Sequence, residues 1–370
     1  MDYRRELEKI RQSADYNRDI SVESEEIVLY GAGALGEMAM DILRTVEMRP
    51  SFVVDKKARG QLKGMRISSL SNLPDRVKKE ALFLVTICTV SYNEIQSELT
   101  STGIRHIVPF YNYAFLVCPE KISNGWFIHN ISPKIEEEVF EICKLLEHDE
   151  CSLHHYLQFC WWKLRGREVQ YANYPVLSGR KYFRAPCMPE LGENETLVDC
   201  GCHRGDTIRA FIDEVNGCFK GVIAFEPDAD NLIYAQRLID DRRVIFDSRA
   251  VSLRTEKRAF MANLGFASKI MQGGKEIVET TNIDDLNICP SIIKIHVEGE
   301  EYNAMRGAAH TLRRNRPILM VFADHNEDGL YKIPSYIQNL KNYVLYFNLH
   351  DYCGNSAVFY MIPEERVKEK

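Results

Sequence analysis

Short apolar segments alternate with amphipathic stretches in two separate parts of the chain. In the first part, residues 26–117, the pattern predicts helices at Met38–Val46 and Tyr92–Thr100, and strands at Ile27–Tyr30, Ser51–Asp55, Ala81–Cys88 and His106–Phe110. Strands that alternate with helices in this way indicate a parallel sheet covered by helices. The preceding residues, 1–25, are polar and are predicted to be helical.

The second α/β part, residues 191–370, shows the same alternation. It predicts strands at Leu197–Cys200, Val222–Phe225, Val244–Phe246, Ile292–Val297, Ile318–Phe322, Tyr343–Leu349 and Ala357–Ile362. The last two strands are joined by the short turn Cys353-Gly-Asn355, which indicates a hairpin. One strand of this pair must therefore run antiparallel to the rest of the sheet.

Residues 118–190, between these two parts, lack the alternation. The pair Ser132-Pro133 is typical of a helix start, with serine as the N-cap and proline in the first turn. A second helix is predicted from Ser152 to Leu164. We therefore expect an N-terminal helix (1–25), a small Rossmann-like domain (26–117), a helical connector (118–190) and a larger α/β domain (191–370).

Composition and charge exclude several classes of function. The chain has 370 residues, of which 45% are hydrophobic and 27% charged, as in folded α/β domains. Its formal net charge is −6 and its Lys and Arg residues are scattered, whereas a nucleic-acid-binding protein has a basic stripe. No apolar run is long enough for a membrane span, and the N-terminus lacks the apolar core of a signal peptide. We expect a cytoplasmic protein that binds no nucleic acid and has no membrane span, and we leave open whether it forms a homo-oligomer.

The eleven cysteines are expected to be reduced and mostly buried, since a reducing compartment and a large core make them small apolar side chains. The pair Cys200 and Cys202 is not followed by a second pair at zinc-site spacing. A structural zinc site is therefore not expected.

The most informative motif is the turn at residues 197–207, LVDCGCHRGDT. Gly201 and Gly205 allow a tight turn and a close approach to a ligand, and the helix that begins at Asp206 directs free N–H groups to the same place. Glu226 follows the next strand, near the spacing at which a carboxylate binds the ribose of a nucleotide cofactor. The glycine spacing differs from that of dinucleotide sites and suits a cofactor without a pyrophosphate, such as S-adenosylmethionine.

Residues 196–345 resemble the FkbM family of methyltransferases. The segments that carry the resemblance, in order, are 198–207 (VDCGCHRGDT), 225–228 (FEPD), 250–252 (AVS), 281–286 (TNIDDL), 293–301 (IKIHVEGEE) and 306–308 (RGA). The resemblance implies a class I methyltransferase sheet of seven strands with an antiparallel terminal hairpin. It also implies S-adenosylmethionine as cofactor and a hydroxyl of a sugar or natural product as the methyl acceptor.

The resemblance assigns roles to residues of the glycine turn and of the strand that follows it. Asp199, Gly201 and Gly205 would hold the methionine end of the cofactor, Glu226 its ribose, and backbone near Ser248 or Arg249 its adenine. Neighbouring residues complete the expected cofactor contacts: Cys202, His203, Asp206, Thr207 and Pro227.

Lys294, His296 and Glu298 alternate with apolar residues along the fourth strand of this domain, so we expect them on one face of the sheet. The family usually has aspartate at the position of His296. An imidazole can act as general base near neutral pH, and Glu298 could orient it or act as the base itself. Lys294 could neutralise a carboxylate. The alternative is a cluster of internal ion pairs with no catalytic role.

Asp324 opens the segment Asp324-His325-Asn326, which ends the fifth strand at the same edge of the sheet. These residues could bind substrate hydroxyls or, with His296 and Glu298, a divalent cation; a solvated loop is the alternative, and no metal is assigned. The fourth strand is followed by VEGEE and not by the Asn/Asp-Pro-Pro-Tyr/Phe turn of enzymes that methylate nucleobase amines. Amine methylation of nucleic acid is therefore disfavoured.

The first domain carries a dinucleotide fingerprint formed by Gly31, Gly33, Gly36 and Asp55. It could bind NAD or a nucleotide-sugar, or it could be a docking domain that retains the fold. Our expectation for the chain is an S-adenosylmethionine-dependent O-methyltransferase that acts on a sugar, nucleotide-sugar, glycan or related natural product. The alternatives are an NAD-dependent sugar oxidoreductase and a scaffold that binds the cofactor without turnover.

Overall fold

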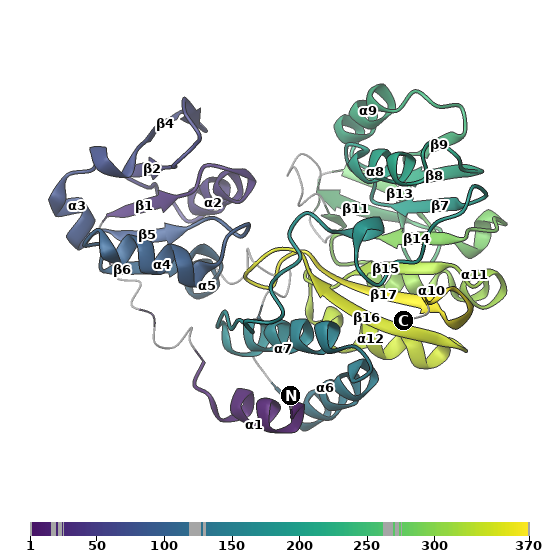
Figure 1. Cartoon of the computed structure of the whole chain (residues 1–370). Coiled ribbons are helices and arrows are strands. Elements are labelled where there is room, and N and C mark those ends of the chain that lie inside the picture. Colours follow the sequence, from purple (N-terminus) through teal and green to yellow (C-terminus); the bar gives the residue numbers. More distant parts are fainter. Residues whose placement is uncertain are drawn as a thin grey trace. The chain divides into compact units, whose positions relative to one another are not determined.

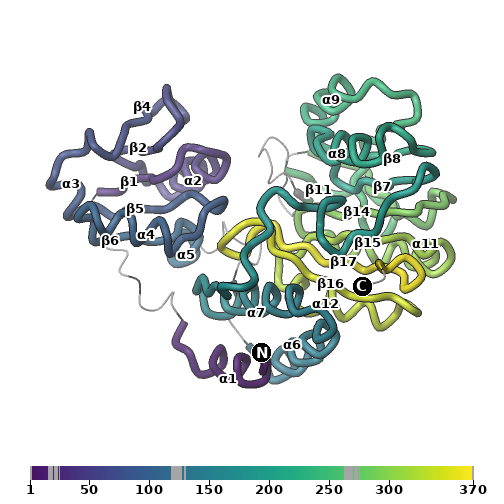
Figure 2. The backbone as a smooth tube through the Cα atoms, viewed as in Figure 1, coloured from purple at the N-terminus to yellow at the C-terminus, as the bar shows by residue number. Residues whose placement is uncertain are grey.

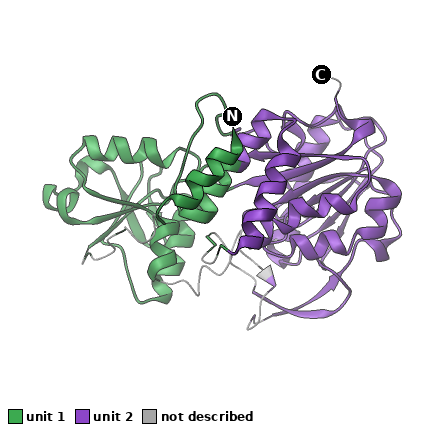
Figure 3. Cartoon of the chain, turned by 90° about the horizontal axis from the view of Figure 1, so that it is seen from below, with its two compact units in different colours: residues 1–131, 157–176, 351–355 green, residues 132–156, 177–350, 356–370 purple. Residues whose placement is uncertain are grey.

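The computed structural model describes residues 2–15, 20, 24, 26–117, 127–128, 131–261, 269–270, 274 and 276–368. The chain divides into two compact units, which Figure 3 colours separately. Unit 1 comprises Met1–Ile131, Leu157–Val176 and Asp351–Asn355; unit 2 comprises Ser132–Tyr156, Leu177–His350 and Ser356–Lys370. The division falls within helix α7 (Glu150–Arg165), so each unit contains segments that are remote in sequence.

Unit 1 contains a six-stranded sheet in the order β3-β4-β2-β1-β5-β6 (Figure 1). All of its pairings are parallel except that of β3 with β4, which confirms the predicted parallel sheet. The strands are β1 (Ile27–Tyr30), β2 (Phe52–Val54), β3 (Gln61–Leu62), β4 (Met65–Ser68), β5 (Leu82–Val85) and β6 (His106–Pro109). β3 and β4 were not predicted, because both are short and alternate in exposure without an apolar run.

The helices of unit 1 begin with α1 (Tyr3–Gln12), where Asp2 caps the first turn by accepting the N–H groups of Arg4 and Arg5. The described helix is shorter than the predicted 1–25, part of which lies outside the described residues. The others are α2 (Ala34–Thr45), α3 (Asp75–Glu80), α4 (Tyr92–Ser101) and α5 (Phe110–Val117).

Unit 2 contains a seven-stranded sheet in the order β16-β17-β15-β14-β7-β8-β9. β17 runs antiparallel to both β15 and β16 while the other pairings of this sheet are parallel, which confirms the predicted hairpin at the end of a parallel sheet. Figure 2 shows that β16 and β17, last in sequence and coloured yellow, lie beside β15. The strands are β7 (Thr196–Cys200), β8 (Gly221–Phe225), β9 (Val244–Asp247), β14 (Ile292–Ile295), β15 (Ile318–Phe322), β16 (Tyr343–Leu349) and β17 (Ala357–Pro363).

The central strands β14 and β15 are buried along their whole length, as expected for parallel strands covered on both faces. The helices of unit 2 are α6 (Pro133–Leu146), α8 (Asp206–Glu214), α9 (Ala229–Leu238), α10 (Glu301–Arg306), α11 (Ala309–Asn315) and α12 (Lys332–Ser335). Ser132 caps α6 by accepting the N–H of Ile135, and Pro133 occupies its first turn, as predicted. None of the helices in the described part of the chain has the length and apolar character that a membrane span requires.

A smaller sheet lies between β9 and β14 in sequence and was not predicted. It has the order β10-β13-β11-β12 and consists of β10 (Ala250–Val251), β11 (Lys257–Met261), β12 (Lys269–Ile270) and β13 (Glu276–Thr281). Most residues of β11 and β13 are at least partly exposed, so the segment has no apolar run that would indicate strands.

Strand β14 ends at Ile295, two residues before the predicted end at Val297. The N–H of His296 still donates to Cys200 O of β7 at 3.0 Å, but the N–H of Val297 donates to the side chain of Glu301. Glu298 then adopts a left-handed conformation with φ +51°. The backbone therefore leaves the sheet at His296, and Glu298 belongs to a turn.

Candidate active site

The turn after β7 requires glycine at two positions. Gly201 has φ +81° and Gly205, which precedes α8, has φ +87°, both in the left-handed region that disfavours a side chain. A Cβ atom on Gly201 would lie 1.9 Å from the carbonyl oxygen of His296. The N–H groups of Gly201 and Cys202 both donate to Phe225 O at 2.9 Å. The turn is thus held against the ends of β8 and β14.

Glu226, directly after β8, closes one side of a crevice next to this turn. Its carboxylate accepts the N–H of His203 at 2.8 Å and the N–H of Asp228 at 2.9 Å. A carboxylate has about four acceptor sites, so two remain after these bonds, as many as the two hydroxyls of a ribose need. Burial of the side chain raises the pKa of Glu226 to about 7.

Asp199 and Lys294 form a buried ion pair behind the turn. Lys294 Nζ lies 2.9 Å from Asp199 Oδ1 and donates a hydrogen bond to Gly201 O at 2.6 Å. The contact with Asp199 lies outside hydrogen-bond angles, and within the described part of the chain neither oxygen of Asp199 accepts a hydrogen bond. Asp199 is fully buried and its Oδ1 faces the Lys294 ammonium, so Oδ2 is the oxygen left for the ammonium group at the methionine end of S-adenosylmethionine.

The structure brings most of the predicted cofactor residues into two adjoining crevices of unit 2, with Gly201, His203 and His296 lining both. The first crevice is also lined by Glu226, Pro227, Asn231, Ala250, Val251, Phe260 and Glu298, among others. The second is also lined by Lys181, Tyr182, Cys202, Asp206, Thr207 and Lys294, among others. Three predicted cofactor residues line neither crevice: Asp199, Gly205 and Ser248. Ala250 and Val251, shortly after β9, line the first crevice.

His296 lines both crevices, and 27% of its side chain is exposed. Its ring stacks on Phe322, with centroids 3.7 Å apart and an interplanar angle of 8°. Its Nδ1 is 3.2 Å from the hydroxyl of Tyr182, and its Nε2 is 3.3 Å from Glu298 Oε1. Burial, together with the nearby charges of His325 and Lys294, lowers the pKa of His296 well below its usual value. The imidazole is therefore neutral at neutral pH.

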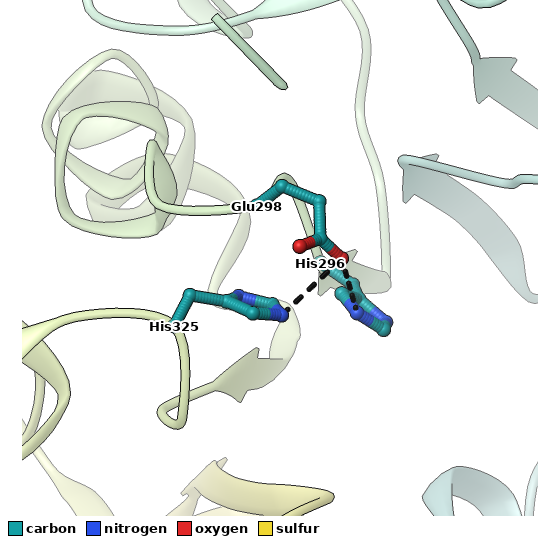
Figure 4. Close-up of side chains that lie close together, drawn as sticks. All are labelled: His296, Glu298 and His325. Carbon is teal, nitrogen blue, oxygen red and sulfur yellow. Dashed lines mark ion pairs between the residues drawn. The ribbon is translucent and has the colours of Figure 1, made fainter. Parts of the chain in front are cut away.

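His325 contacts the same carboxylate oxygen of Glu298 as His296 does (Figure 4). Its Nε2 is 3.3 Å from the same Oε1 atom, and its Nδ1 is 2.7 Å from Glu301 Oε1. Burial opposes protonation of His325, but the carboxylates of Glu298, Glu301 and Asp324 outweigh it and raise the pKa of His325 well above its usual value. Burial also raises the pKa of Glu298.

The remaining predicted residues of the site take more specific positions than the sequence indicated. Asp324 Oδ1 is 3.7 Å from His325 Nε2, while Asp324 Oδ2 accepts the N–H of Ser356 at 2.8 Å. Lys294 pairs with Asp199 and not with Glu298, so its charge lies on the side of the glycine turn.

Three side chains of the site were not identified from the sequence: Tyr182, Glu301 and Phe322. Glu301 stands in the acidic run GEE directly after Glu298, and Phe322 ends β15, so position alone could have indicated both. Tyr182 belongs to a 3₁₀ turn within an irregular segment and has φ +58°. No local pattern marks it.

Unit 1 has its own crevice, at the ends of its parallel strands. Gly31, Gly33 and Asp55 line it, together with Lys56, Thr86, Glu98 and others. Asp55 accepts the N–H of Ala32 at 2.9 Å and those of Lys57 and Ala58, each at 2.7 Å. Gly36 does not line the crevice: a Cβ there would lie 2.5 Å from Gly31 O, so this glycine allows α2 to pack closely against the turn.

Known proteins share the pattern of unit 2 and the fold of the whole chain. Residues 199–352 match the model of the methyltransferase FkbM domain. The crystal structure of methyltransferase FkbM from Methylobacillus flagellatus KT aligns with 97% of this chain and 98% of its own, at 19% sequence identity and a TM-score of 0.67. It therefore shares the fold.

A putative rRNA-methylase from Clostridium thermocellum aligns with 47% of the chain and 90% of its own, at 12% identity and a TM-score of 0.29, which is too low to support an argument. No curated protein matches the sequence. Residues 199–352, with the glycine turn described above, therefore form an FkbM methyltransferase domain.

Proposed function

We propose that unit 2 uses S-adenosylmethionine to methylate a hydroxyl group of a sugar, nucleotide-sugar, glycan or related natural product. The FkbM methyltransferase domain at residues 199–352 supports methyltransferase activity; the cofactor and the acceptor are what we add. The observation that carries the proposal is that the Gly201 turn, the Glu226 carboxylate and the neutral His296 imidazole line one crevice. S-adenosylmethionine, when bound, supplies an electrophilic sulfonium methyl group.

The residues of the first crevice fit the parts of this cofactor. The free acceptor sites of Glu226 would receive the ribose hydroxyls, and Ala250 and Val251 offer an apolar surface to the adenine. Asp199 and the Gly201 turn would hold the methionine end. His296, which lines the same crevice, would then stand beside the bound cofactor.

His296 would act as the general base for the acceptor hydroxyl. If Nδ1–H donates to the oxygen of Tyr182, Nε2 carries the lone pair of the ring. It would accept the hydroxyl proton as the new C–O bond forms and the bond between the methyl group and the sulfonium sulfur breaks. Glu298 Oε1, 3.3 Å from Nε2, would then stabilise the imidazolium. A hydroxyl needs such a base because it becomes acidic only as it attacks.

The proposal is tested with the full-length chain, S-adenosylmethionine and a panel of sugars, nucleotide-sugars and glycans. Calorimetry is expected to show cofactor binding, and S-adenosylhomocysteine is expected to accumulate with at least one acceptor. His296→Asn should lower kcat by about 10²- to 10⁴-fold, the usual contribution of a general base, with little change in cofactor affinity. Absence of cofactor binding would overturn the proposal, and binding without turnover across the panel would favour a scaffold.

Unit 1 supports a second function, which is binding of NAD or a nucleotide-sugar. The supporting observation is the crevice lined by Gly31, Gly33 and Asp55 at the start of α2. A Cβ on Gly33 has no atom within 4 Å, so Gly33→Asp adds a negative charge beside a bound phosphate without a clash.

Titration of the full-length chain with NAD, UDP and UDP-sugars should show binding that Gly33→Asp abolishes and Gly192→Asp, in unit 2, preserves. The full chain is needed because unit 1 includes residues 157–176 and 351–355. No binding at millimolar ligand would contradict this function. Reduction of the nicotinamide in the presence of sugars would instead favour an oxidoreductase.

A further inference from the structure

We propose that His296, Glu298 and His325 form a binding site for one divalent transition-metal ion, with the acceptor hydroxyl as a further ligand. The inference rests on the proposed methyl transfer but changes the role of His296. With an ion bound, the Nε2 lone pair would coordinate the metal, and the ion would acidify the acceptor hydroxyl in place of the imidazole. Metal binding by these residues can be measured without any methyl transfer.

The three side chains converge in the manner of a metal site. His296 Nε2 and His325 Nε2 are each 3.3 Å from Glu298 Oε1, and the three candidate ligand atoms all lie within 4.8 Å of one another (Figure 4). Ligand atoms about 2.1 Å from a metal ion are separated by about 3.0–3.4 Å when they subtend tetrahedral or octahedral angles. Two of the three separations therefore already match those around a bound ion.

The second ring nitrogen of each histidine has its own partner. His325 Nδ1 contacts Glu301 Oε1 at 2.7 Å, and His296 Nδ1 contacts the Tyr182 hydroxyl at 3.2 Å. Glu301 is itself fixed, since its two oxygens accept the N–H groups of Val297 and Gly299 at 2.9 and 3.0 Å. Metal-binding histidines are oriented by such outer contacts, which here direct both Nε2 atoms to one point.

The backbone at Glu298 supports a functional position for this side chain. Glu298 has φ +51°, a conformation that costs a non-glycine residue on the order of 1 kcal/mol or more. An ion-pair cluster is the alternative explanation, and it accounts for His325 between Glu298 and Glu301. His296 joins such a cluster in the tautomer that donates Nε2–H to Glu298 Oε1, whereas metal binding needs the Nε2 lone pair, so Co²⁺ binding separates the two explanations.

The donor set selects the class of metal. Two imidazole nitrogens and one carboxylate suit Zn²⁺, Mn²⁺, Fe²⁺ or Co²⁺, whereas Ca²⁺ and Mg²⁺ prefer oxygen ligands alone. Three protein ligands leave a position open for a substrate oxygen, and coordination lowers the pKa of a bound hydroxyl. The role of the ion would be to bind and acidify the acceptor.

The test uses the metal-stripped full-length chain and Co²⁺ as the probe. Visible absorption bands should report one bound Co²⁺ per chain, and Zn²⁺ should displace it. Glu298→Gln and His325→Asn should each weaken Co²⁺ binding by about 100-fold or more, because each removes a ligand. His106→Asn, an exposed histidine on β6 in unit 1, is the matched control and should bind Co²⁺ as the unaltered chain does.

Cofactor binding measured on the same samples separates this inference from the proposed function. S-adenosylmethionine binding without Co²⁺ binding, or Co²⁺ binding that both ligand variants retain, overturns the metal site and leaves the proposed function intact. Co²⁺ binding without S-adenosylmethionine binding supports the metal site and contradicts the proposed function. If thermal unfolding shows that Glu298→Gln does not fold, His296→Asn replaces it, since that side chain is partly exposed.

Discussion

The carbonyl oxygen of His296 lies so close to the α-carbon of Gly201 that a Cβ atom there would come within 1.9 Å of it. The contact joins the turn after β7 to the loop after β14, and these strands are neighbours in the sheet, with Ile295 paired to Cys200. The distance between the cofactor turn and the proposed base is thus set by backbone contact between adjacent strands.

Gly201→Ala should therefore damage both folding and cofactor binding. The left-handed conformation and the collision with His296 O together should cost about 2–5 kcal/mol in the free energy of unfolding. Chemical denaturation and calorimetry with S-adenosylmethionine measure the two effects. Gly192→Ala is the control, because the nearest atom to its Cβ is Glu195 Oε1 at 4.0 Å. A Gly201→Ala protein with unchanged stability and affinity would contradict the prediction.

Glu226 should make cofactor affinity depend on pH. Burial raises its pKa from 4.5 to about 7, so the carboxylate that accepts ribose hydroxyls becomes fully ionised only above neutral pH. S-adenosylmethionine should therefore bind more tightly as pH rises from 6 to about 8, which follows from that pKa. Calorimetry across this range, with Glu226→Gln as the variant that loses the dependence, checks this. If Glu226→Gln shows the same pH dependence of S-adenosylmethionine affinity, another group causes it.

The same pKa predicts the opposite trend for stability. Since the folded pKa lies above the unfolded one, the unfolded state loses its proton first as pH rises from 4.5. The contribution of Glu226 to the free energy of unfolding should therefore fall by about 2–3 kcal/mol between pH 4.5 and about 7, and stay level above that. The difference in unfolding free energy between the unaltered chain and Glu226→Gln at each pH isolates this contribution.

Lys294→Met should destabilise unit 2 by about 3–5 kcal/mol, because it leaves the charge of Asp199 buried without its partner. Adding Asp199→Asn to this variant should restore part of the loss. Lys332→Met breaks a partly exposed pair with Asp328 and should cost less than about 1 kcal/mol. Denaturant unfolding of the single and double variants gives the coupling energy, and strictly additive effects would show that the pair is not coupled.

Tyr182→Phe should reduce kcat about 3- to 10-fold, since it removes one hydrogen bond that orients the His296 ring. Tyr182 is a positioning residue, so the KM for S-adenosylmethionine should change little. Tyr234→Phe, whose ring is 51% exposed on α9, should leave both constants unchanged. A fall in melting temperature with an unchanged kcat would assign Tyr182 a purely structural role.

Much of the fold of unit 2 could be predicted because it depends on local signals. Apolar strands of parallel sheets and a short turn between two of them identified the seven-stranded sheet and its antiparallel β17. The end of β14 could not be predicted in the same way. The strand ends there because the N–H groups of Val297 and Gly299 donate to the Glu301 carboxylate and not to a neighbouring strand.

The sequence by itself determined the Gly201 turn, Gly205 and Glu226, because tight backbone turns and strand ends depend on residues close together in the chain. Only the tertiary structure decided how the polar side chains pair. It paired Lys294 with Asp199. It also brought Tyr182 to His296, 114 positions away, and His325 to Glu301, 24 positions before it. Such contacts depend on which strands and loops become neighbours and on which partner each buried polar group finds there, and neither is encoded in a local pattern.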